Sequence, residues 1–104
     1  ILVIGSGFSF HNLNAFFSQT PGRPDAANDA FQDWLVETCT GPLSQSEREQ
    51  RLIEWEQAPS ARYCHPREEH LVPLHVCVGM MGGPAVVAFD DQIFGKRGVA
   101  FLWR

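Results

Sequence analysis

The chain has 104 residues, 44% of them hydrophobic and 19% charged, with a formal net charge of -4. This length fits one domain with a modest core, and the composition is that of a globular protein in water. The negative charge and the absence of a Lys/Arg cluster argue against nucleic acid as a partner. No apolar stretch is long enough to span a bilayer, so we expect neither a membrane partner nor a signal peptide. Three cysteines without framework spacing indicate reduced thiols and a cytoplasmic protein.

The first residues have the pattern of a strand. Ile1-Leu2-Val3-Ile4 is apolar and Gly5-Ser6-Gly7 follows, which predicts a buried strand with sheet neighbours on both sides. His11 comes in the loop after this strand, where open α/β sheets bind ligands, and a short helix follows through Phe17. The two glycines also suit a phosphate loop, but Phe10 stands where the dinucleotide fingerprint needs its third glycine, which argues against nucleotide binding.

Two helices are predicted in the middle of the chain. Asp25 is a good N-cap for a helix whose apolar residues recur at helical spacing, and Gly41-Pro42 ends it. Ser44 with Glu47 and Ser46 with Glu49 each fit a capping box, so the second helix begins there and runs to about Gln57. Its apolar face is thin, which predicts a surface helix.

The stretch 63–74 concentrates ionisable side chains. Pro66 suits the first position of a helix and two glutamates follow in its first turn. This helix would run to Met81 and is apolar nearly all round, so we expect it to be buried together with His70. Pro73 lies within the pattern and predicts either a kink or a late helix start.

The last part of the chain predicts a sheet. Gly82-Gly83-Pro84 breaks the helix, and the ranges 85–89 and 98–103 read as two short antiparallel strands joined by the polar turn 90–97. Since these are the only strands besides residues 1–4, we expect residues 1–104 to be the carboxyl-terminal part of a larger α/β domain. That domain would be a three-layer mixed sheet with flanking helices.

The histidines are the candidate functional side chains. His11 is either a catalytic acid/base or a loop residue bonded to backbone. His65 is either functional or a helix cap. His70 is the strongest ligand candidate, because a buried imidazole needs a partner, whereas His75 points to another element or solvent. A structural zinc site is not supported, since only His65 and His70 have suitable spacing.

Two histidine motifs resemble a known family. In order and spacing, the matching residues resemble the class III extradiol ring-cleavage dioxygenases, and most closely the DOPA 4,5-dioxygenase-like branch. These residues are Gly5-Ser6-Gly7, His11-Asn12-Leu13, Trp55, Ala58-Pro59, Ala61-Arg62, His65-Pro66, Glu69-His70 and Pro73-Leu74. The resemblance covers almost the whole chain and agrees with a carboxyl-terminal part of such an enzyme.

The resemblance implies a non-haem Fe(II) site that binds a catechol and O₂, with Zn(II) possible in purified protein. It assigns a metal ligand to His70, with His65 as the less favoured choice, while two further histidine ligands belong to the family's amino-terminal half. It implies that His11 is the acid/base, contacts the substrate and reaches the metal in resting zinc-bound forms. Substrate contacts are expected from His65, Asn12 and Phe10, although ordinary core packing is the simpler role for Phe10.

The expected function is therefore an Fe(II)-dependent extradiol dioxygenase that cleaves a DOPA-like catechol with O₂. Three protein ligands on one face of iron leave positions open for both substrates, and a nearby neutral imidazole can move the hydroxyl protons. A zinc-dependent hydrolase and a non-catalytic fragment or binding module remain the alternatives. We expect the 104-residue chain alone to bind iron weakly and to be inactive.

Overall fold

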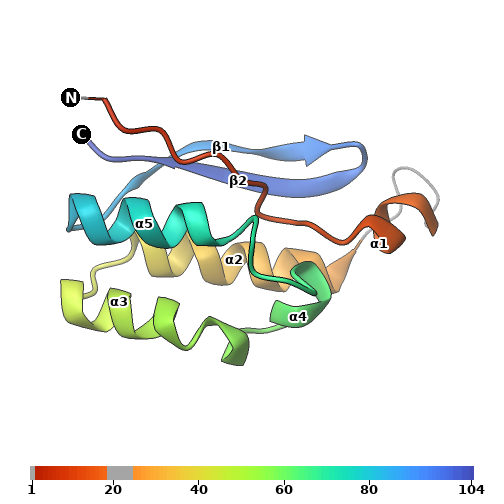
Figure 1. Cartoon of the computed structure of the whole chain (residues 1–104), viewed down its shortest axis with the longest axis horizontal. Coiled ribbons are helices and arrows are strands. Elements are labelled where there is room, and N and C mark those ends of the chain that lie inside the picture. Colours follow the sequence, from red (N-terminus) through yellow and green to blue (C-terminus); the bar gives the residue numbers. More distant parts are fainter. Residues whose placement is uncertain (1, 19–24) are drawn as a thin grey trace.

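The computed structural model describes residues 2–18 and 25–104, which form helices and one antiparallel sheet (Figure 1). In chain order the elements are α1 (Leu13–Ser18), α2 (Ala26–Thr40), α3 (Gln45–Ile53), the 3₁₀ helix η1 (Trp55–Gln57), α4 (Ala61–Cys64), α5 (Val72–Met81), β1 (Val86–Ile93) and β2 (Lys96–Leu102). Helix α2 packs against the β1–β2 hairpin and also against α3 and α4. This mixture of helices and sheet confirms the α/β prediction, and the sheet that the structure describes has two strands.

Helix α2 begins and ends where its sequence signals predict. The Asp25 carboxylate accepts a hydrogen bond from the Asn28 amide, which would otherwise lack a partner in the first helical turn. Phe31 and Leu35 are fully buried on its inner face. Gly41 closes the helix, and its amide donates to the carbonyl of Glu37.

Helix α3 has the predicted capping box, in which Ser44 and Glu47 bond each other's backbone amides. The helix ends at Ile53 and continues as η1, so the predicted end near Gln57 includes this tighter turn. Arg48 is fully buried and donates to the carbonyls at the end of α2, among them Thr38 (3.0 Å) and Gly41 (2.7 Å). The Arg48 guanidinium therefore holds α3 against the carboxyl end of α2, where the helix dipole is negative.

The hairpin is longer than its sequence pattern predicts. The predicted polar turn 90–97 is wrong, because most of these residues pair in β1 and β2, with Ile93 opposite Lys96. The turn itself is Phe94-Gly95, and both residues have positive φ (51° and 80°). Two such residues match the right-handed twist of paired strands and so allow a two-residue loop.

The predicted strand at residues 1–4 is wrong for the described part, and Ile1 lies outside the described residues. Residues 2–4 are not assigned to a strand, and Leu2 and Ile4 are 82% and 78% exposed. An extended segment needs a neighbour to bond its backbone groups. The described sheet consists of β1 and β2 and offers residues 2–4 no such pairing.

Helix α5 begins later than Pro66. Residues 66–71 form bends and turns, and the helix starts at Val72 with Pro73 in its first turn, which is the late start that this proline predicted. The expectation of a helix buried all round is wrong, since Val78 is buried while Val76 and Met80 are 52% and 59% exposed. Among the described residues, no helix is long and apolar enough to cross a membrane.

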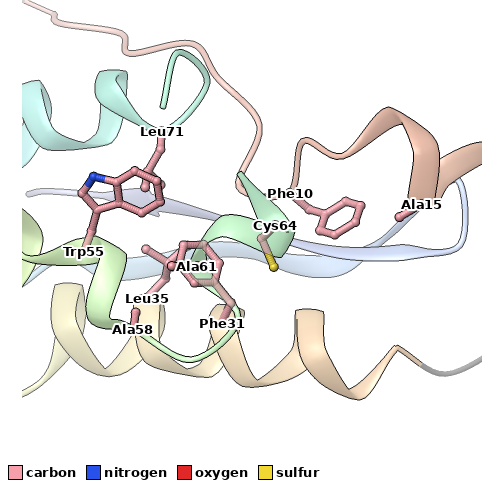
Figure 2. Packing of buried hydrophobic residues seen from close by; sticks show 9 residues of the cluster. All are labelled: Phe10, Ala15, Phe31, Leu35, Trp55, Ala58, Ala61, Cys64 and Leu71. Atoms are coloured by element: carbon pink, nitrogen blue, oxygen red, sulfur yellow. The ribbon is translucent and has the colours of Figure 1, made fainter. Parts of the chain in front are cut away.

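The core lies between α2, α4 and the chain that leads to α1 (Figure 2). The buried residues of its main cluster are Phe10, Ala15, Phe31, Leu35, Trp55, Ala58, Ala61, Cys64 and Leu71. All three cysteines are free thiols, as predicted, and Cys39 and Cys64 are buried. The core therefore holds the segment before α1 and the segment after α4 in fixed positions, and these two segments carry His11 and His70.

Candidate functional site

The structure brings His11 and His70 together. Their rings stack with centroids 3.6 Å apart and planes inclined by 13°. His11 is half-buried, whereas His70 is exposed and precedes α5, so its predicted burial on a helix face is wrong. Both line a hollow of about 210 Å³. The other residues around this hollow are Asn12, Leu13, Asn14, Pro66, Arg67 and Glu69.

Two glycines allow these distant segments to meet. A Cβ on Gly7 would lie closer than 3.0 Å to the carbonyl oxygen of His70, and a Cβ on Gly5 would lie 2.6 Å from Cys77 Sγ. The chain before α1 therefore runs directly against the start of α5, an approach that only residues without side chains permit. The Gly-Ser-Gly motif serves this close contact.

Ser9 anchors the loop that carries His11. Its carbonyl accepts hydrogen bonds from His65 Nε2 and Gln32 Nε2, each at 2.8 Å. Its hydroxyl oxygen accepts from the amide of Val99 in β2 at 2.9 Å. One residue thus joins the loop to α2, to the segment after α4 and to the sheet.

Two further hydrogen bonds fix the loop at the candidate site itself. The His11 amide donates to the carbonyl of Cys64 (2.8 Å), and Asn12 Nδ2 donates to the carbonyl of Tyr63 (2.8 Å). Asn12 Oδ1 also accepts from the amide of Ala15, as an N-cap of α1 does. The backbone that carries the His11 ring is therefore held rigidly.

His65 and Phe10 do not line the hollow, although both were predicted to contact substrate. His65 is fully buried, and burial is the main reason that its pKa is lowered to about 4. Phe10 is fully buried in the core, where its ring meets Phe16 edge-on with centroids 5.0 Å apart. Asn12 does line the hollow, but both ends of its amide bond to backbone.

A buried polar cluster that the sequence did not predict supports Tyr63. Asp25 Oδ2 accepts from the Tyr63 hydroxyl (2.6 Å) and from Lys96 Nζ (2.5 Å). Burial raises the pKa of the Asp25 carboxyl, but these bonds and the Asn28 amide outweigh it and hold the pKa below its ordinary value. Asp25 could be identified as a helix cap, whereas nothing in the sequence around Lys96 distinguishes it from a surface lysine.

The two imidazoles are side chains of a type that can bind a metal ion. Imidazole nitrogens suit both iron and zinc, but their lone pairs lie in the ring plane, so two nearly parallel rings do not point at one ion. Joint coordination requires one ring to turn, which the exposed His70 side chain has room to do. Within residues 2–18 and 25–104, no group of three or more His, Cys, Asp or Glu side chains could hold a metal ion.

Comparison with known proteins agrees with the histidine motifs. The chain is 30% identical over 84 residues to a 4,5-DOPA dioxygenase extradiol-like protein of Schizosaccharomyces pombe, which covers 76% of the chain and 26% of that protein. It is 34% identical over 83 residues to the 4,5-DOPA dioxygenase extradiol of Beta vulgaris, covering 79% of the chain and 29% of that protein. No protein-family model matches the chain. The chain thus spans little more than a quarter of these relatives, and over that part it is similar to proteins named 4,5-DOPA dioxygenase extradiol.

Proposed function

We propose that this chain contributes His11 and His70 to the active site of a non-haem Fe(II)-dependent extradiol dioxygenase that cleaves a catechol. The observation that carries the proposal is the contact between these two imidazoles beside a hollow of about 210 Å³. The dioxygenase names of the two relatives support the reaction class. The remaining metal donors would come from outside the described residues.

In this proposal His70 binds the metal and His11 transfers protons. His70 is a metal ligand, because its exposed ring can turn towards an ion at the hollow. Iron, when bound, would activate the catechol and O₂. His11, held by its backbone bond to Cys64, keeps a ring nitrogen at the hollow, where it takes the proton of the second catechol hydroxyl and later returns one.

Asn14, Arg67 and Glu69 form a polar rim around the same hollow. The Arg67 and Glu69 side chains are 85% and 64% exposed, with Nη1 and Oε1 3.7 Å apart. A pair this exposed is weak and readily exchanged for other partners. Both side chains can therefore turn towards polar groups of a substrate that enters the hollow.

The test compares His70→Ala with His11→Ala in the protein that carries this chain together with its remaining metal donors. His70→Ala should lose bound iron, while His11→Ala should keep it and lose ring cleavage, measured as catechol-dependent O₂ uptake. His75→Ala is the matched control, because the ring nitrogens of His75 lie 3.2 and 2.7 Å from the carbonyl oxygens of Leu71 and Leu52, and His75 does not line the hollow. Normal O₂ uptake by both site variants would refute the assignment.

A further inference from the structure

We propose that His65 is a positioning residue, whose hydrogen bond to the Ser9 carbonyl holds the His11 ring against His70. The effect of this hydrogen bond on catalysis rests on the proposed function. Its effect on the contact between the His11 and His70 rings does not. In sequence, His65 lies between His11 and His70. It directly follows Cys64, whose carbonyl accepts a hydrogen bond from the His11 amide. The segment Cys64-His65 therefore binds the loop that carries His11 through two groups, the His65 side chain and the Cys64 carbonyl.

The surroundings of His65 fix both its orientation and its tautomer. The ring is fully buried and packs against Phe31 and Trp55, with centroids 5.5 and 6.3 Å away. The Ser9 carbonyl is an acceptor only, so Nε2 carries the proton. Because burial keeps this ring neutral, Nδ1 is then a bare acceptor, and it has no hydrogen-bond partner among the described residues.

This arrangement suits positioning better than binding. The nitrogen that bears the proton is committed to Ser9, and the other nitrogen is enclosed in the core away from the hollow. A buried polar atom without a partner is costly. The hydrogen bond from Nε2 and the packing against Phe31 and Trp55 are the contacts that offset this cost.

Gln32 also donates a hydrogen bond to the Ser9 carbonyl, but this bond does not replace the one from His65. It donates to the same Ser9 carbonyl at 2.8 Å, yet it projects from α2 and also bonds Asn28 Oδ1 at 2.9 Å. Its bond holds the loop to α2. The bond from His65 instead holds the loop to the segment that leads to His70, and the contact between His11 and His70 depends on that segment.

The test uses two polar replacements of different reach in the intact chain. His65→Gln places an amide N–H near the position of Nε2 and should preserve the bond. His65→Asn reaches only the position of Nδ1 and should lose it. The readout is the nuclear Overhauser contact between the His11 and His70 rings, which should persist in His65→Gln and fall below detection in His65→Asn.

His75→Asn is the matched control. His75 is partly buried, and its Nε2 lies 2.7 Å from the Leu52 carbonyl oxygen. This variant loses a comparable bond at α3 and should keep the ring contact. If His65→Asn does not fold, His65→Gln decides the matter alone, because loss of the ring contact in folded His65→Gln overturns the proposal. Persistence of the contact in folded His65→Asn overturns it as well.

Turnover separates this inference from the proposed function. In the protein with its full ligand set, His65→Asn should lower kcat by about 10–100-fold, as loss of a supporting hydrogen bond commonly does, with His65→Gln restoring most of it. If the ring contact follows the expected pattern but no variant cleaves a catechol, the positioning role stands and the dioxygenase assignment fails.

Discussion

Replacing Lys96 by methionine tests the buried ion pair that joins β2 to the start of α2. The side chains of Lys96 and Asp25 are 4% and 9% exposed. Loss of one partner from a buried pair costs about 3–5 kcal/mol. Asp25 keeps hydrogen bonds from Tyr63 and the Asn28 amide, so we expect the lower end, about 3 kcal/mol.

Urea denaturation followed by tryptophan fluorescence measures this loss. For a slope of about 1–3 kcal/mol per M, a loss of 3 kcal/mol lowers the midpoint by roughly 1–3 M. Arg62→Met is the matched control, because Arg62 is 44% exposed and pairs with Glu56 and Glu68 at the surface. Such surface pairs contribute about 0–1 kcal/mol. An equally small effect of Lys96→Met would refute the reasoning.

Acid should remove the difference between the wild type and Lys96→Met. The pKa of Asp25 in the folded chain lies below its ordinary value of 3.8. A carboxyl with a lowered pKa contributes stability that is complete above the ordinary value and is lost as the pH falls through the folded value. The two midpoints should therefore differ most well above pH 3.8 and approach each other as the pH falls below that value.

Three further outcomes are expected. Gly7→Ala should destabilise the chain and shift the ring signals of the candidate site in NMR spectra. Gly79→Ala, whose Cβ meets nothing within 4 Å, should instead raise the free energy of unfolding by about 1 kcal/mol. Below pH 6.5 stability should fall by at most about 1.4 kcal/mol per pH unit until about pH 4, because His65 resists protonation in the fold, and denaturation of His65→Gln should show a flatter profile. A thiol reagent followed by mass spectrometry should label Cys77 first, because burial raises the pKa of the other two thiols to about 12.

Local signals in the sequence predicted the helices well. The cap at Asp25, the capping box at Ser44 and the late start at Pro73 each depend on neighbouring residues only, and all three are confirmed. The motif spacing also singled out His11 and His70, which the fold brings into contact. Their catalytic and metal-binding roles stay predictions.

Features that depend on distant neighbours were not predictable. Residues 2–4 have the composition of a strand but not the paired neighbour that a strand needs. Pro66 fits a helix start, yet the chain turns there and exposes His70. The buried cations Arg48 and Lys96 depend on carbonyls and a carboxylate that only the tertiary fold supplies.

Helix α5 affects how unfolding of this chain can be monitored. It has no charged residue, and its outward side chains, among them Val76 and Met80, are more than half exposed. Dyes such as anilinonaphthalene sulfonate bind apolar surface and are usually taken to report a molten globule. Here the dye should already fluoresce with the native chain, so a rise in its signal during acidification does not by itself indicate a loosened core.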